Sequence, residues 1–438
     1  MPEIQAFRGL RYNLAQVGSL SEVIAPPYDV IDSVLQQQLY QRHPANMIRL
    51  ELNRQEPEDK SPDEVYLRAA RTLRSWIRDG VLMNEADPAI YVYHQEYQYA
   101  GETYLRKGFM SRVRLQRFGE GNIYPHEQTL AKAKEDRLKL TRATEANLSQ
   151  IFGLYPDAKN EAQNVLERHI MGARPLEATD HLGVIHRVWP VTDARVIGEV
   201  SSLIANLPMF VADGHHRYET ACNYRDELAA AGKLTPEHPA NFVLTMLVAM
   251  EDPGLLVLPT HRLLSGIPEF TAEQLQSRLA GYFDCEVTGH GPEAAAHNWS
   301  EMEKVNDQQM ICLYTSKDSK WSTITAREQA LEKMAEIAPD QSADWRGLGV
   351  AMLHRLVFEE LLGLRDMPKP TYVHLVEEVV EGLHGKLEGN LHYPLAALVM
   401  PATIEHIRAI SLHKERMPAK STYFYPKLFC GLVLHSLQ

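Results

Sequence analysis

Apolar side chains recur with the helical period in several stretches of the chain. Within residues 64–79, Val65, Ala69, Leu73 and Trp76 fall on one stripe, which predicts an amphipathic helix. Similar spacing, bounded by turn-forming or charged residues, predicts further helices. These cover residues 33–42, 130–142, 193–207, 218–231 and 343–362.

Other stretches are continuously apolar or alternate with period two, as strands do. They cover residues 4–12, 90–99, 103–115, 184–191, 242–250, 255–258, 393–400 and 423–433. Short turn sequences predict two hairpins, one across Ala100-Gly101 and one across the Glu-Asp-Pro-Gly segment 251–254. Prolines and charges mark 25–30 as a turn and 54–63 as a loop. Helices and strands are interleaved throughout, so we expect a mixed α/β fold, of the α/β or α+β class.

Composition and charge narrow the class of protein. The 438 residues are 45% hydrophobic and carry a net charge of -12. That length suits two or three domains or one elaborated domain. Nucleic-acid binding is disfavoured, since it needs a basic surface. The four cysteines form no zinc-site spacing, and no basic-then-apolar leader opens the chain. The apolar runs are too short to span a bilayer. We therefore expect a cytoplasmic protein with reduced thiols.

The most informative stretch is 209–221, where an apolar run ends at Asp213-Gly214 and a helical pattern follows. A helix start offers backbone N–H groups and a positive dipole end, so it binds anions. His215, His216 and Arg217 add side-chain donors there. Asp213 could orient a histidine or hold Mg²⁺. Two alternatives remain open: Asp213 as a simple N-cap beside exposed histidines, and a metal site at the two histidines. Adjacent side chains diverge on a helix, which disfavours the metal site.

A second cluster lies upstream, in the Tyr-Pro-His-Glu-Gln-Thr segment 124–129. Pro125 is expected near a helix start, which places His126 and Glu127 at that start. Glu127 could act as a general base toward a hydroxyl group. Downstream, Lys132 shares a helix face with Thr129 and Asp136, and Arg137 lies close to it. The alternative is a solvated helix with salt bridges.

Two further clusters carry cations near strands. His261 and Arg262 follow a strand end, where sites collect in α/β folds; a surface loop is the alternative. In segment 417–427, Lys420-Ser421-Thr422 resembles the tail of a P-loop, but no Gly-rich loop precedes it. With Lys427 it would still suit a polyanionic ligand. An edge strand protected by lysines is the alternative.

Segment 213–217 resembles the signature of the ParB/sulfiredoxin superfamily, and within it the free serine kinases. Those enzymes pair an upstream Pro-His-Glu segment with a downstream Asp-Gly-x-His-Arg turn, and both occur here in that order. The resemblance implies that Glu127 is the base for a serine hydroxyl. It also implies that Asp213, His215, His216 and Arg217 surround the transferred phosphate of a nucleotide.

The whole chain resembles a bacterial family of unknown function, the DUF family numbered ten-fifteen. Its hallmarks stand at 25–30, 125–137, 212–217, 259–262 and 417–427. Compared with the compact serine kinases, the gap between Glu127 and Asp213 is much longer, and large N- and C-terminal parts are added. The resemblance implies a ParB/sulfiredoxin-like core with a mixed sheet at 121–265. An N-terminal α/β region at 1–120 and a C-terminal α/β region at 266–438 would flank it.

The leading hypothesis is a phosphotransferase of serine metabolism that uses ADP or ATP with Mg²⁺ and acts on a small metabolite such as L-serine. The catalytic candidates are His126, Glu127 and Asp213. The candidates for phosphate and nucleotide binding are Lys132, Arg137, Gly214, His215, His216, Arg217, His261, Arg262, Lys420, Ser421, Thr422 and Lys427. The alternatives are a ParB-like nucleotide-binding regulator without turnover and a phospho-metabolite hydrolase. Sulfiredoxin-like reduction is disfavoured because it needs a cysteine within the motif. The oligomeric state and the convergence of the four clusters stay open.

Overall fold

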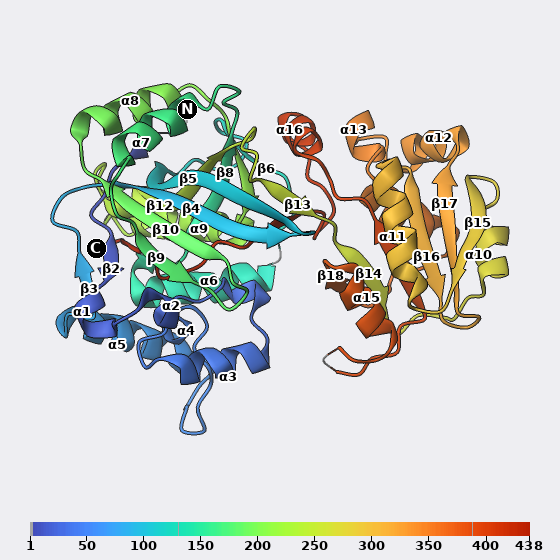
Figure 1. The fold of residues 1–438 in the computed structure, drawn as a ribbon, viewed down its shortest axis with the longest axis horizontal. Helices are drawn as coiled ribbons and strands as arrows, with labels where there is room; N and C mark the ends of the chain where they lie inside the picture. The colour runs from blue at the N-terminus through green and yellow to red at the C-terminus, as the bar shows by residue number, and fades with distance from the viewer. Residues whose placement is uncertain (1–2, 130, 388) are drawn as a thin grey trace. The chain divides into compact units, whose positions relative to one another are not determined.

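A computed structural model describes residues 3–129, 131–387 and 389–438. By contacts, the chain divides into two compact units. Unit 1 comprises Met1–Pro125, Thr129–Leu256 and Pro426–Gln438, and unit 2 comprises His126–Gln128 and Val257–Tyr425. Each unit is therefore built from discontinuous segments (Figure 1). The division into regions 1–120, 121–265 and 266–438 that we expect from the sequence stays a prediction.

The centre of unit 1 is a nine-stranded sheet in the order β6-β11-β8-β12-β5-β4-β10-β9, with β1 also paired to β5. The β6–β11 and β8–β12 pairs are parallel and the others antiparallel, so the expected mixed α/β fold with a mixed sheet is confirmed. The strands are β1 (Ile4–Gln5), β4 (Ile90–Tyr99), β5 (Glu102–Arg114), β6 (Ile123–Pro125), β8 (Ile151–Tyr155), β9 (Leu176–Thr179), β10 (Ile185–Val191), β11 (Met209–Asp213) and β12 (Phe242–Ala249).

Helices α7 (Glu161–Ile170), α8 (Ala194–Ile204) and α9 (His215–Ala230) share one hydrophobic core with the sheet. Leu166, Val200 and Tyr218, one from each helix, are fully buried in it. Burying large side chains of this kind stabilises the unit by about 1.5–3 kcal/mol each. This packing fixes the start of α9 against the end of β11.

Unit 1 has further helices before and beside the sheet. They are α1 (Leu14–Val17), α2 (Leu20–Val23), a 3₁₀ turn (Tyr28–Val30), α3 (Ser33–Arg42), α4 (Ile48–Glu51), α5 (Glu64–Arg78), α6 (Ala131–Thr144) and a second 3₁₀ turn (Pro239–Asn241). Short pairs β2 (Leu10–Tyr12) with β3 (Leu82–Asn84) and β7 (Ala146–Asn147) with β21 (His435–Ser436) complete it. In Figure 1, α1–α5 are the blue helices of the N-terminal part.

Unit 2 contains a six-stranded sheet in the order β15-β17-β16-β19-β14-β18. Its strands are β14 (His261–Leu264), β15 (Phe283–His290), β16 (Met310–Thr315), β17 (Lys320–Ala326), β18 (Thr371–Val373) and β19 (Leu395–Val399), and β13 (Leu256–Leu258) pairs separately with β20 (Tyr423–Tyr425). Its helices are α10 (Ala272–Leu279), α11 (Ala294–Val305), α12 (Glu328–Ile337), α13 (Ala343–Arg346), α14 (Gly349–Ala351), a π-helix (Met352–Leu361), α15 (Val376–Leu383) and α16 (Ile404–Leu412).

Several helices and strands lie where the local sequence pattern predicted them. Helix α3 has its expected bounds, with the Asp32 carboxylate accepting a hydrogen bond from Leu35 N–H at its start. The first hairpin is confirmed, since β4 and β5 pair across Ala100 and Gly101, which have φ of 49° and 81°. Leu130, the first residue of the expected 130–142 helix, lies outside the described residues, and α6 begins at Ala131.

The second hairpin prediction was wrong. Strand β12 lies between β5 and β8, so neither of its edges is open to β13. The strand expected over 423–433 ends at Tyr425. The single helix expected over 343–362 is interrupted at Leu348, whose extended ψ of 130° ends one helical run before the next. No helix among the described residues is both long and apolar enough to cross a membrane.

Candidate functional site

The Asp-Gly turn, residues 213–217, joins the end of β11 to the start of α9 in unit 1. Gly214 is the N-cap residue, with a φ of 92° that favours glycine. A Cβ added at Gly214 would lie 3.0 Å from the Arg217 guanidinium. The Asp213 carboxylate accepts a hydrogen bond from Gly214 N–H at 2.8 Å, one residue before the position of a helix N-cap. The N-cap position is therefore taken by Gly214, which has no side chain to cap the helix start.

Replacing Gly214 with alanine is expected to destabilise the protein by about 1–2 kcal/mol for the backbone conformation, with a further loss from crowding Arg217. Gly232 is the matched control, because it has a φ of 68° at the other end of α9 and nothing within 4 Å of an added Cβ. Urea unfolding of both alanine variants separates the two costs. Equal losses would show that the approach to Arg217 contributes nothing.

Three charged side chains meet at the Asp-Gly turn. Lys427 Nζ lies 3.2 Å from Asp213 Oδ2, and a guanidinium nitrogen of Arg217 lies 3.8 Å from the same oxygen. Their side chains are largely buried, with 10%, 21% and 12% exposure for Lys427, Asp213 and Arg217. Two cations and one carboxylate thus meet at the turn, and the charge of a second carboxylate, Asp29, also acts on Arg217.

Arg217 is held by a hydrogen bond to the backbone as well as by its ionic contact with Asp213. Its guanidinium donates a hydrogen bond to the Gln150 carbonyl oxygen. Burial alone would lower the pKa of Arg217, but Asp213 and Asp29 outweigh it, so the pKa is raised and the side chain stays charged. A fixed, charged guanidinium beside a helix start is suited to an anion.

The segment carrying Lys427 is held by polar residues that the sequence patterns did not single out. Gln95 donates to the Lys427 carbonyl oxygen at 3.0 Å, and Arg106 donates to the Pro426 carbonyl oxygen at 2.5 Å. Arg106 is fully buried, which lowers its pKa, and it lies 4.9 Å from the Phe152 ring centroid. Its role depends on a partner 320 residues away, so local sequence carries no signal for it.

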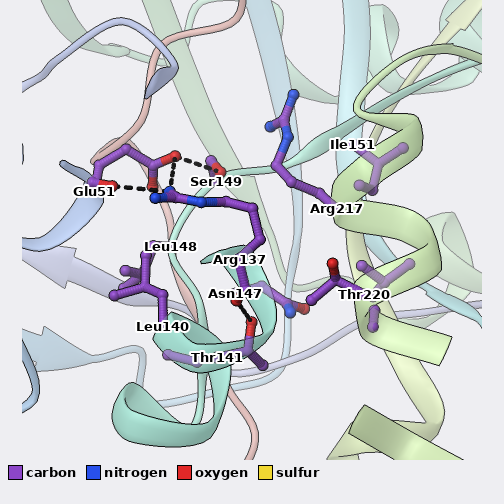
Figure 2. Close-up of a pocket in the computed structure, with 13 residues that line it drawn as sticks. Glu51, Arg137, Leu140, Thr141, Asn147, Leu148, Ser149, Ile151, Arg217 and Thr220 are labelled. Atoms are coloured by element: carbon purple, nitrogen blue, oxygen red, sulfur yellow. Dashed lines mark hydrogen bonds and ion pairs between the residues drawn. The ribbon is translucent and has the colours of Figure 1, made fainter. Parts of the chain in front are cut away.

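Arg137 lies beside a small cavity of about 40 Å³ that Arg217 also lines (Figure 2). Its guanidinium donates to the Glu51 carbonyl oxygen at 2.9 Å and to Asp136 Oδ2 at 2.7 Å, and it lies 4.2 Å from the Tyr28 ring centroid. The cavity can hold water but not a nucleotide. Arg137 thus joins α6 to α4, which supports a structural role.

Glu127 belongs to unit 2, in a group of residues that we call the Glu127 cluster: His126, Glu127, Arg262, Lys420 and Thr422. The Glu127 carboxylate accepts a hydrogen bond from Lys420 N–H. The His126 ring lies 2.8 Å from the Thr422 hydroxyl through Nε2, and Arg262 donates to the Lys420 carbonyl oxygen at 2.9 Å. Lys420 has a φ of 59°, a strained conformation of the kind found at functional sites.

The backbone at Glu127 differs from the expected helix start. Pro125 ends strand β6 at the edge of the unit 1 sheet, where a residue without an N–H is tolerated. Glu127 then forms an isolated parallel bridge with Met417, and α6 begins only at Ala131. Glu127 is therefore held in extended backbone rather than in the first turn of a helix.

Arg262 is the most enclosed cation of unit 2. It is fully buried, which lowers its pKa to about 10 although Tyr372 and Glu127 act in the other direction. Its Nε donates to His354 Nε2 at 3.2 Å. Burial lowers the pKa of His354 to about 3, so this histidine is neutral and can accept that hydrogen bond.

His261 is not brought together with Arg262. Adjacent side chains of a strand point to opposite faces, and His261 packs 4.8 Å from the Trp299 ring, on α11. Its Nε2 is buried and has no hydrogen-bond partner among the described residues. The structure gives His261 the surroundings of a core residue.

His261 is expected to contribute to the loss of folding stability at acidic pH. Burial lowers its pKa to about 3, whereas an unfolded histidine titrates near 6.5. Between these values the unfolded chain binds a proton that the folded chain does not, so stability falls as pH drops from about 6.5. His261→Phe should lose about 2 kcal/mol less than the unmodified protein between pH 7 and pH 5 in urea unfolding. The exposed His297→Phe serves as the control, and equal losses in all three proteins would contradict the expectation.

The remaining candidates are distributed between the units. In unit 1, His215 is buried, His216 is half-buried and Lys132 is exposed. In unit 2, the Ser421 hydroxyl donates to the Pro418 carbonyl oxygen at 2.5 Å. Within the described residues, no group of three His, Cys, Asp or Glu side chains could hold a metal ion.

Residues 4–360 match the model of a family described as protein of unknown function (DUF1015). The chain belongs to this family. The match covers most of the chain, including β11, the Asp-Gly turn and Glu127. No curated protein matches it.

Solved structures with a similar fold include a free serine kinase variant in complex with ADP, 14% identical, with a TM-score of 0.34 and coverage of 69% of this chain and 84% of that one. A conserved hypothetical protein from Pyrococcus furiosus is 12% identical, with a TM-score of 0.33 and coverages of 70% and 89%. SbnI with a C-terminal truncation, from Staphylococcus aureus, is 11% identical, with a TM-score of 0.33 and coverages of 74% and 86%.

Proposed function

We propose that this protein is a nucleotide-dependent phosphotransferase that acts on the hydroxyl group of a small metabolite such as L-serine. The observation that carries the proposal is the Asp-Gly turn, where Arg217 and Lys427 lie beside the start of a 16-residue helix. Phosphoryl transfer depends mainly on positioning and charge neutralisation. This turn supplies both.

The phosphate groups of ADP or ATP would bind at the start of α9. Gly214 permits close approach of the backbone, and the helix dipole favours negative charge. Arg217 and Lys427 add positive charge from partly enclosed positions, where an ion pair is stronger than in water. Asp213 keeps both cations in place.

Glu127 would act as the general base. The acceptor hydroxyl oxygen forms a bond to the transferred phosphorus while the bond from phosphorus to the bridging oxygen of the nucleotide breaks. The hydroxyl proton passes to the Glu127 carboxylate, and the shortened nucleotide leaves carrying the added negative charge. The hydrogen bond from Lys420 N–H orients the carboxylate. A backbone N–H does not transfer its proton to a carboxylate, so Glu127 can still accept the proton of the acceptor hydroxyl.

Mg²⁺ would accompany the nucleotide. Protein sites for Mg²⁺ commonly use one or two carboxylates together with phosphate oxygens and water. Asp213 is the one carboxylate of the turn that could serve, and its Oδ2 already faces Lys427. These residues fit a metal held mainly by phosphate oxygens, which would neutralise charge on the transferred group.

The test is direct. Purified protein is incubated with L-serine, Mg²⁺ and either ADP or ATP, and phosphoserine is detected by ³¹P NMR and mass spectrometry. Formation of phosphoserine, or of another phosphorylated hydroxy amino acid, supports the proposal. Tight nucleotide binding with no product indicates a regulator, and phosphate release from phosphoserine without nucleotide indicates a hydrolase.

A further inference from the structure

Unit 2 contains a cavity of about 420 Å³, which residues of segments 124–129 and 417–427 line in part. Its volume lies within the range of small-molecule sites. Its walls come from the end of α12 and the loop after it, from the π-helix, and from the segment before Lys420. Polar and charged residues of the lining include Gln128, Asp340, His354, Arg355, Glu359 and Arg416.

Hydrogen bonds fix the walls of this cavity to one another. The Ser342 hydroxyl donates to Glu415 Oε2 at 2.5 Å, and Trp345 Nε1 donates to the Arg416 carbonyl oxygen at 2.9 Å. The segment at 338–345 is therefore attached to the segment at 415–416. A cavity with attached walls is preformed, which lowers the cost of ordering on binding.

The π-helix supplies one wall. Helices of this type are rare and are found frequently at functional sites. Here the π-helix spans Met352–Leu361 and brings His354, Arg355 and Glu359 to the cavity. Gly349, at the start of α14 just before it, has no room for a Cβ, which would lie 2.6 Å from the Gln308 carbonyl oxygen. This close approach anchors the start of the helical segment.

Some residues that line the cavity are direct neighbours of Glu127 and of Lys420, which holds the Glu127 carboxylate. Gln128 follows Glu127 directly, and Pro418 and Ala419 directly precede Lys420, whose N–H is held by the Glu127 carboxylate. His354 accepts the hydrogen bond from Arg262, which itself donates to the Lys420 carbonyl oxygen. A ligand in the cavity would thus lie against the chain segments that orient the proposed base.

The charges in the lining are of both signs. Arg355 and Arg416 are cationic, and Asp340 and Glu359 are anionic. Arg355 lies 2.7 Å from Glu359, so the two signs are close together in the wall. A polyanion would meet two carboxylates here as well as two cations, which disfavours a second nucleotide site. A small molecule with one carboxylate and one ammonium group would find a partner for each charge.

We propose that this cavity binds the amino-acid backbone of the acceptor, a zwitterionic hydroxy amino acid, with Arg355 and Arg416 facing its carboxylate and Asp340 and Glu359 its ammonium group. This inference rests on the proposed phosphotransferase function in one respect: only that function requires the bound amino acid to carry a hydroxyl group. It makes the C-terminal part of the chain the region that selects the acceptor.

The experiment measures binding without nucleotide, so it does not depend on turnover. Isothermal titration calorimetry of the full chain uses L-serine, L-threonine and L-homoserine as probes. It also uses two analogues of serine with a single charge, 3-hydroxypropanoate, which lacks the ammonium group, and ethanolamine, which lacks the carboxylate. At least one of the three amino acids is expected to bind. The two one-charge analogues are expected to bind about tenfold or more weakly than that amino acid.

Variants locate the site. Arg355→Ala and Arg416→Ala are each expected to weaken amino-acid binding about tenfold, whereas Arg408→Ala, an exposed position on α16 outside the lining, leaves it unchanged. Thermal melts verify that each variant is folded, and the analogue comparison on the unmodified protein needs no variant. Equal binding of one-charge analogues, equal binding by all variants, or no binding of any probe would overturn the inference.

The two proposals can fail separately. Amino-acid binding that Arg355→Ala weakens, together with no phosphorylated product, would retain this site and reject the phosphotransferase. Phosphoserine formation with an unchanged KM for serine in Arg355→Ala and Arg416→Ala would retain the phosphotransferase and reject this site.

Discussion

Replacing Glu127 with glutamine is expected to lower kcat for phosphoryl transfer by about 10²–10⁴-fold and to leave nucleotide affinity unchanged. The amide cannot take the proton of the acceptor hydroxyl, so the rate loses the contribution of general base catalysis. Nucleotide affinity is retained because the proposed phosphate-binding residues, Arg217 and Lys427, lie in unit 1 and are not altered.

The local structure around Glu127 should survive this change. Glutamine has nearly the same shape, and its Oε1 can still accept the hydrogen bond from Lys420 N–H. The bridge to Met417 uses backbone atoms and does not depend on the side chain. A loss of rate in Glu127→Gln therefore reports proton transfer rather than misfolding, and an unchanged thermal melt verifies this.

Glu405→Gln provides the matched control for Glu127→Gln. Glu405 is exposed on α16 of unit 2, and the same loss of one carboxylate there should not alter the rate. Rates are measured from phosphorylated product at saturating nucleotide and acceptor, and affinity by calorimetry. A Glu127→Gln variant with the full rate would exclude Glu127 as the base.

Elements with local determinants could be predicted from the sequence. The start of α3 follows from the Asp32 cap, and the β4–β5 hairpin follows from a two-residue turn that needs positive φ at both positions. The Asp-Gly turn belongs to the same class, since an apolar run, a glycine and a helical pattern follow one another directly. Such features depend on residues within a few positions, which is where sequence patterns are informative.

Features that depend on distant partners could not be predicted. The apolar run that forms β12 is compatible with a hairpin, and only its pairing with β5 and β8 excludes one. The Arg106 contact with Pro426 joins segments 320 residues apart. The π-helix adds a residue to each turn without a distinct hydrophobic pattern, so it was expected as an ordinary helix.

The placement of His261 shows a limit of a different kind. Its position next to Arg262 suggested a joint role, but neighbours in a strand point to opposite faces. The sequence placed His261 after a strand end, whereas it lies within strand β14 (His261–Leu264), so the alternation of side chains there was not expected. Arg262 contacts the Lys420 carbonyl oxygen and His261 packs against Trp299 because of this alternation.

Replacing Arg217 with alanine is expected to weaken binding of ADP or ATP about 100-fold, as for the loss of charge-assisted hydrogen bonds to phosphate. Arg217→Lys should fall between, about tenfold weaker than the unmodified protein, because it keeps the charge but loses the planar pair of donors. Calorimetric titration with each nucleotide in the presence of Mg²⁺ gives these affinities.

The same substitution should also cost stability, and the two effects have to be measured apart. Arg217→Ala leaves the Gln150 carbonyl oxygen without its donor and Asp213 with Lys427 as its remaining cation at the turn, which is expected to cost about 1–3 kcal/mol of folding free energy. Urea unfolding gives that cost without nucleotide. Arg195→Ala, at an exposed position of α8, is the control expected to change neither quantity.

The order of the three affinities decides between two roles for Arg217. If the guanidinium binds phosphate, affinity falls from arginine to lysine to alanine, while the folded fraction under assay conditions stays close to one. If it only fixes the turn through Asp213 and Gln150, nucleotide affinity follows the loss of folding stability and recovers when excess nucleotide or a stabilising osmolyte restores the folded state. Unchanged affinity in a folded Arg217→Ala variant would remove the Asp-Gly turn from the proposed phosphate site.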